Sequence, residues 1–130
     1  MKKVLFINFG HASTPVEATG VDVDRIDIVV QLADPSDPQE ITQKAIELAT
    51  GVAGKIAEAS RDGKIVVVGL PGASGIAAAL VLALQGLLGY APLAVVGTRR
   101  NGGFVYDLNR AIDLTEIRDK ARLFRGEYGL

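Results

Sequence analysis

The segment from residue 64 to residue 88 constrains the fold more than any other part of the chain. Residues 64–69 (KIVVVG) form a β-branched run, which is typical of a strand in the centre of a sheet covered on both faces. The Gly- and Pro-containing loop 70–75 leads directly into residues 76–88, an Ala- and Leu-rich segment with almost no polar face. A buried strand followed at once by a helix predicts a sheet that is mainly parallel.

Short apolar runs elsewhere predict further strands. The expected strands are residues 4–9, 25–31, 92–98 and a short antiparallel edge strand at 104–108. Between them we expect a short helical turn at 14–19, an acidic loop at 22–24 and a turn at 99–103. This alternation over 130 residues indicates a single α/β domain, residues 1–130, with the architecture of a small three-layer sandwich.

Two further helices are marked by their first residues. Asp37, Pro38 and Glu40 form a capping box with proline at the first helical position, and the helix is expected to end near residue 59. Its expected buried stripe is Ile41, Ala45, Leu48, Ala49, Val52 and Ile56. Asp113 caps a last helix that Gly126 ends, and its expected inner stripe is Leu114, Ile117, Ala121 and Phe124.

Composition excludes several kinds of partner and site. A net charge of −1 gives no overall field for long nucleic acid or for an anionic membrane. The absence of Cys removes disulfides and thiolate metal sites and favours a reducing, cytoplasmic location. With a single histidine, no metal centre and no cofactor are expected. Residues 75–97 are apolar enough to suggest a membrane span, but Gly86, Gly89 and Pro92 divide them into a buried helix and a strand.

The apolar helix 76–88 also predicts an oligomer. One side of this helix can pack on the sheet, and a domain of this size has little else to cover the other side. We therefore expect a homodimer with the second side at its interface. An exposed apolar face or an edge strand would also allow higher assembly when a ligand binds.

Three loops are expected to meet beyond the carboxyl ends of the parallel strands, where open α/β sheets bind ligands. These are loops 10–15, 70–75 and 98–103. Loop 70–75 has free backbone N–H groups at a helix N-terminus, which suit a phosphate, although a tight turn with Ser74 as the helix cap explains the same residues. Its candidate ligand-binding residues are Pro71, Gly72, Ala73, Ser74 and Gly75. The loop has neither the P-loop spacing nor the dinucleotide glycine pattern.

The other two loops add side chains that suit a nucleotide. His11 is the only histidine; it either binds a phosphate or a base or has a structural role, and Ser13 and Thr14 add hydroxyls beside it. Phe9 can stack on one base. Arg99 either pairs with a phosphate or belongs to a solvated turn.

Two short motifs resemble a small family of accessory proteins of type III CRISPR systems. The first is Asn8-Phe9-Gly10-His11 with Thr14 close behind, and the second is Pro71-Gly72 followed by 77–80 (AAAL) and 86–92. The resemblance covers roughly residues 4–98. Members of the family are similar to reduced versions of the Rossmann-like, CARF-like sensor domains that bind cyclic oligoadenylates, which are antiviral second messengers.

The resemblance implies a homodimer with a ring-shaped ligand across its two-fold axis and a role in dampening the signal. Cyclic tetra-adenylate is the expected ring, because its four-fold repeat fits a two-fold dimer. The protein then either sequesters the messenger or, as a metal-independent ring nuclease with His11 as base, cleaves it by attack of a ribose 2′-OH. No acid–base pair is visible, which favours sequestration. An unrelated nucleotide or sugar-phosphate protein and a structural dimerisation module are the alternatives.

Overall fold

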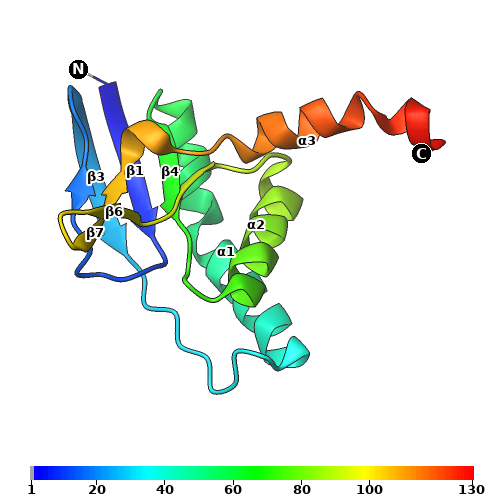
Figure 1. Cartoon of the computed structure of the whole chain (residues 1–130), viewed down its shortest axis with the longest axis horizontal. Coiled ribbons are helices and arrows are strands. Elements are labelled where there is room, and N and C mark those ends of the chain that lie inside the picture. Colours follow the sequence, from blue (N-terminus) through cyan, green and yellow to red (C-terminus); the bar gives the residue numbers. More distant parts are fainter. Residues whose placement is uncertain (1) are drawn as a thin grey trace.

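The computed structural model describes residues 2–130, and its centre is a four-stranded parallel sheet (Figure 1). The strands are ordered β3 (Val21–Asp27), β1 (Lys2–Asn8), β4 (Ile65–Gly69) and β5 (Leu93–Val95). All three neighbouring pairs run parallel. The predicted α/β fold with a mainly parallel sheet is therefore confirmed.

The two long helices cover one face of this sheet. Helix α1 (Pro38–Arg61) connects β3 to β4, and helix α2 (Ser74–Leu88) connects β4 to β5. Both connections cross the sheet in the same direction, so right-handed crossovers place both helices on the same side (Figure 1). Leu5 and Ile7 of β1 pack in the apolar cluster that contains most of the buried residues of these helices.

A small second sheet covers the other face. It consists of β2 (Val16–Glu17), β7 (Gly103–Asp107) and β6 (Thr98–Arg100), in that order. Val4 and Phe6 of β1 pack against Tyr106 of this sheet, because successive side chains of a strand point to opposite faces. The predicted antiparallel strand at 104–108 is β7, and its antiparallel partner is β6 in this second sheet.

Two local predictions in this region are wrong. The expected helical turn at 14–19 contains strand β2, which pairs with β7. The expected turn at 99–103 is shortened to Asn101 and Gly102, since Thr98–Arg100 already forms β6. Both Asn101 (φ 48°) and Gly102 (φ 82°) have positive φ, which is the requirement of the tight two-residue hairpin turn for which Asn-Gly is favoured.

The second strand of the parallel sheet is also displaced from its prediction. We expected an acidic loop at 22–24 and a strand at 25–31, whereas β3 spans Val21–Asp27. Asp22 and Asp24 are exposed on this edge strand and alternate with apolar residues that pack inward. Exposed charges on an edge strand oppose pairing with other chains. Residues 28–31 leave the sheet because β1, the only neighbour of β3, ends at Asn8.

The predicted start of α1 is confirmed, with one difference. The carboxylate of Asp37 caps the helix by accepting a hydrogen bond from the Gln39 backbone N–H. Glu40 does not complete the expected capping box. Its two carboxylate oxygens instead accept hydrogen bonds from the backbone N–H groups of Ala33 and Asp34. Five residues of α1 are fully buried: Ala45, Ala49, Val52, Ile56 and Ala59.

The C-terminal helix differs most from its prediction. Helix α3 (Leu114–Arg122) begins at the expected cap, Asp113, which accepts from the Glu116 N–H. The expected inner stripe is wrong except for Leu114, which packs on the core, because the helix leaves the body of the molecule (Figure 1). Gly126 does not end this helix and lies within the 3₁₀ turn Arg125–Tyr128. No helix in residues 2–130 is long and apolar enough to span a membrane.

Candidate functional site

The strand order places a crevice between β1 and β4. The chain leaves β1 toward β3 on one side and leaves β4 toward β5 on the other, so their connections diverge at this point. Ligands of open α/β sheets bind beyond the carboxyl ends of the strands at such a divergence. A hollow of about 860 Å³ lies here, walled by the loop after β1, the loop after β4 and the chain between β3 and α1.

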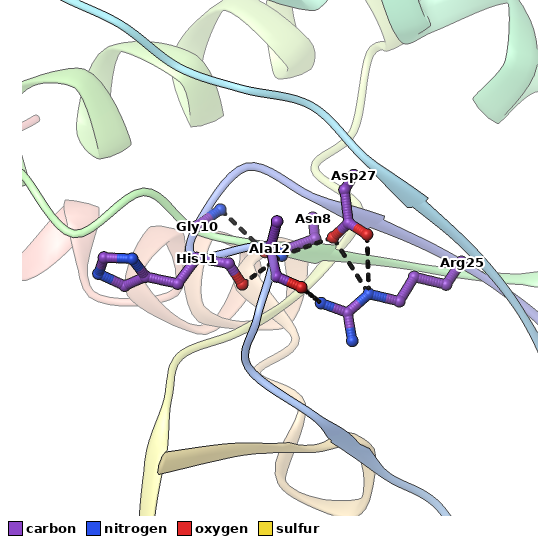
Figure 2. A network of polar contacts seen from close by, with 6 residues as sticks. All are labelled: Asn8, Gly10, His11, Ala12, Arg25 and Asp27. Atoms are coloured by element: carbon purple, nitrogen blue, oxygen red, sulfur yellow. Dashed lines mark hydrogen bonds and ion pairs between the residues drawn. The ribbon is translucent and has the colours of Figure 1, made fainter. Parts of the chain in front are cut away.

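The side chain of Asn8 fixes the loop after β1, which is the first of these walls. This buried residue ends β1, and none of its surface is exposed. Its Nδ2 donates hydrogen bonds of 2.9 Å to the backbone oxygen of His11 and to Oδ1 of Asp27. Its Oδ1 accepts a hydrogen bond of 2.8 Å from the Gly10 N–H. One side-chain amide therefore fixes both ends of the turn that presents His11 (Figure 2).

Arg25 extends this network along β3. Its Nε lies 3.1 Å from Oδ1 of Asp27, and its Nη2 donates a 2.9 Å hydrogen bond to the Ala12 backbone oxygen. Its guanidinium also lies over the Phe6 ring, 5.6 Å from the ring centroid. The Asp27 carboxylate is thus occupied by Asn8 and Arg25. The imidazole of His11 points away from this network (Figure 2).

Tyr106 of the second sheet supports the same turn. This tyrosine is buried, and its ring packs on Phe6 with 5.3 Å between centroids. A Cβ at Gly10 would collide with the Tyr106 hydroxyl and would lie 3.0 Å from the backbone oxygen of Leu70. Glycine is therefore required at position 10 by close approach.

The second wall is the loop that leads into α2. The N–H of Phe9 donates to the Gly69 oxygen at 2.9 Å, so both loops leave the sheet side by side. Pro71 is buried, whereas Gly72 and Ala73 are exposed. Ala73 is the N-cap of α2, and no side chain caps this helix, which corrects the interpretation of Ser74 as the cap. The first N–H groups of α2 and the positive end of its dipole suit an anion.

The third wall is the extended chain from Ile28 to Ala33, which sequence patterns alone did not assign to the site. The Ile28 N–H donates to the Asn8 oxygen at 2.8 Å. The next residues held by hydrogen bonds are Ala33 and Asp34, whose N–H groups donate to the Glu40 carboxylate; this pair of bonds is called the Glu40 clamp. At the end of this wall, hydrogen bonds from the hydroxyl and the N–H of Ser36 lower the pKa of Asp34. This wall is mainly apolar, so it suits the flat face of a base.

Half of the predicted site residues line the hollow. They are Phe9, Gly10, His11, Pro71, Gly72 and Ala73. Asn8 lies behind the wall. The remaining predicted residues, Ser13, Thr14, Ser74, Gly75 and Arg99, are not among the lining residues. A Cβ at Gly75 would lie 3.2 Å from Cδ1 of Ile41, so this glycine serves the approach of α2 to α1.

Arg99 lies on β6, and the third predicted loop does not form a wall of the hollow. The guanidinium of Arg99 stacks on the Phe104 ring across the hairpin, 5.5 Å from the centroid. Tyr106, by contrast, supports the site although no sequence pattern singled it out. Tyr106 comes close to Gly10 only because the second sheet packs on the main sheet.

The lining restricts the chemistry that the hollow can perform. Among the described lining residues, His11 is the only ionisable side chain. Within residues 2–130, no group of His, Asp or Glu side chains is arranged to hold a metal ion. The hollow therefore offers backbone N–H groups, one imidazole and an apolar wall to a ligand.

Comparisons with models of known protein families, with curated proteins and with solved structures find no match for this chain.

Proposed function

We propose that this protein binds a cyclic oligoadenylate, with cyclic tetra-adenylate favoured, and sequesters it to dampen type III CRISPR signalling. The hollow at the ends of β1 and β4 is the binding site. Each subunit of a cytoplasmic homodimer contributes one such hollow to the ring. Nucleotide phosphates bind near the N-terminus of α2, and a base lies on the apolar wall.

One observation carries this proposal. The two motifs of the family resemblance are about 60 residues apart in the sequence, yet both line one hollow. Gly10 and His11 belong to one of its walls, and Pro71 and Gly72 belong to another. Loops that follow neighbouring parallel strands meet at the edge of the sheet where open α/β folds bind ligands. Their convergence supports a shared ligand.

The charge distribution of the site favours sequestration over cleavage. Cleavage by acid–base chemistry needs a base and an acid on opposite sides of the scissile phosphate. His11 supplies one such group, and the carboxylate of the network behind it, Asp27, is held by Asn8 and Arg25. A binder needs only the N–H groups, the shape of the hollow and the apolar wall.

A ring nuclease is the second candidate, and the free imidazole of His11 favours it. Its Nε2 or Nδ1 would take the proton of a ribose 2′-OH as that oxygen bonds to the adjacent phosphorus. The bond from phosphorus to the 5′ oxygen then breaks, and the departing oxygen takes up a proton. The products are a 2′,3′-cyclic phosphate and a 5′-hydroxyl, so no water and no metal are consumed.

A single-turnover incubation separates these candidates. An excess of protein is mixed with labelled cyclic tetra-adenylate, and the nucleotide is analysed by denaturing chromatography while the same sample is run on a native gel. Intact, retained ligand supports sequestration. Linear products that disappear in His11→Ala support the nuclease.

The control is Lys55→Gln, an exposed position on α1 that lies outside the hollow. This variant is expected to retain the ligand as the unmodified chain does. Absence of both binding and cleavage by the unmodified chain would contradict the proposal and leave an unrelated nucleotide or sugar phosphate as the ligand.

A further inference from the structure

The C-terminal segment 114–130, here called the arm, leaves the body of the molecule with its apolar side chains beyond Leu114 exposed. Its base is well anchored: Thr115 Oγ1 bonds both the N–H and the oxygen of Ala91, at 2.9 and 3.0 Å. Every residue from Asp119 onward is exposed, and the arm projects past the end of α2 (Figure 1).

The exposed side chains of the arm form a stripe. Ile117, Ala121 and Phe124 follow one another at spacings of four and three, which places them on one side of α3 and of the turn after it, and Tyr128 lies beyond them in the 3₁₀ turn. Tyr128 is 74% exposed, and Leu123 beside the stripe is 81% exposed. Contacts of Leu114 and Thr115 at its base hold α3 in place, and the exposed apolar side chains further along the arm are available to pack against another surface.

A matching apolar surface lies on α2. This helix buries Ile76, Leu80 and Leu84, whereas Leu82, on the opposite side of the helix, is 68% exposed and has the exposed residues Ala78 and Gly86 one turn away on either side. No charged side chain occurs anywhere in α2. The outer side of α2 is thus uncharged, and Leu82 is the large apolar side chain exposed on it.

The total surface area is large enough for both surfaces to lie in an interface between two copies. The chain has 7907 Å² of accessible surface, whereas a compact monomer of 13.7 kDa has about 6,600 Å². The excess, about 1,300 Å², is more than the roughly 800 Å² that each partner buries in an interface of standard size. A second copy of this chain supplies the same arm and the same face.

We infer that two copies of the chain exchange their arms, so that the arm of each subunit lies on the outer side of α2 of its partner. The arrangement is a two-fold symmetric interface in which the same two surfaces meet twice. It refines the homodimer of the proposed function by naming the surfaces that form it. It leaves the hollow at the opposite, carboxyl ends of the strands open.

The test uses no nucleotide, so its result is independent of ligand binding. Sedimentation of the full chain at micromolar concentration is expected to give twice the mass of 13.7 kDa. Leu82→Glu and Phe124→Glu place a charge at exposed positions, so each is expected to fold and to sediment as a monomer. Circular dichroism of both variants verifies folding.

Crosslinking between introduced cysteines identifies the contact. The chain has no cysteine of its own, so only the introduced residues can react. Leu82→Cys in one preparation and Phe124→Cys in another, mixed and treated with a short bis-maleimide, are expected to give a mixed dimer that joins the two variants. As the control, Asp22→Cys on the edge strand β3 is mixed with Phe124→Cys in place of Leu82→Cys. This mixture is expected to give no mixed dimer. A monomeric unmodified chain, or a dimer that persists in Phe124→Glu without the mixed crosslink, would overturn the exchange.

Discussion

The side-chain amide of Asn8 donates a 2.9 Å hydrogen bond to the carboxylate of Asp27 on the neighbouring strand. Through this bond the last residue of β1 is joined to the last residue of β3, directly behind the turn that carries His11. The remaining capacity of the amide is used by the turn itself. The position of His11 therefore depends on a residue that does not line the hollow.

Asn8→Asp is expected to lower the free energy of unfolding by about 2–3 kcal/mol at neutral pH. A carboxylate cannot donate to the His11 oxygen, and it would face the negative charge of Asp27. Burial and that charge raise the pKa of the introduced carboxyl, so folding takes up a proton and the loss shrinks as the pH falls. Urea unfolding at several pH values measures this. Asn109→Asp, at an exposed position, is the control, and an equal loss in both variants would contradict the role of Asn8.

Gly10→Ala is expected to destabilise the protein by about 1–3 kcal/mol, because the new methyl group meets the Tyr106 hydroxyl in a closely packed region. Tyr106→Phe removes that hydroxyl. Adding it to Gly10→Ala is therefore expected to restore part of the loss, whereas it gives no gain alone. Thermal unfolding of the two single variants and the double variant forms the test, and strictly additive losses would show that Tyr106 does not restrict position 10.

Glu40→Ala is expected to loosen the third wall of the hollow without unfolding α1. Its carboxylate holds the N–H groups of Ala33 and Asp34 at 3.0 and 2.7 Å, and nothing else along the wall from residue 29 replaces that clamp. Hydrogen exchange of these two amides is expected to accelerate at least about tenfold, as local opening becomes easier. Glu58→Ala, exposed on the same helix, serves as the control. Unchanged exchange in Glu40→Ala would mean that the wall is held by other contacts.

Much of the fold could be predicted from the sequence because its strongest signals are local. The β-branched run of β4 and the capping aspartates of α1 and α3 each specify an element through neighbouring residues. The failures have definite causes. Alternating Val and Asp in β3 is the pattern of a half-covered strand, and the acidic residues outweighed it in the prediction. The Asn101-Gly102 pair was a hairpin signal inside a segment interpreted only as a turn.

The site was predictable only in part, since it depends on which strands become neighbours. The two loops after β1 and β4 were expected from parallel strands alone. The position of Tyr106 depends on the second sheet, and the wall after β3 depends on where β1 ends. Arg99 was placed at the site by assuming that its loop also followed a strand of the main sheet, whereas it lies within the hairpin of the second sheet. Such relations involve residues distant in the chain, and local patterns do not contain them.

The most direct test of the central claim measures the affinity of cyclic tetra-adenylate for Gly72→Asp and Gly72→Ala. A Cβ at this position meets nothing within 4 Å, so both variants are expected to fold, and they differ chiefly in the carboxylate. Titration calorimetry should show affinity near that of the unmodified chain for Gly72→Ala. For Gly72→Asp it should show a loss of at least about tenfold, or about 1.4 kcal/mol. Equal, undiminished affinity in both variants would contradict a phosphate-binding role for this hollow.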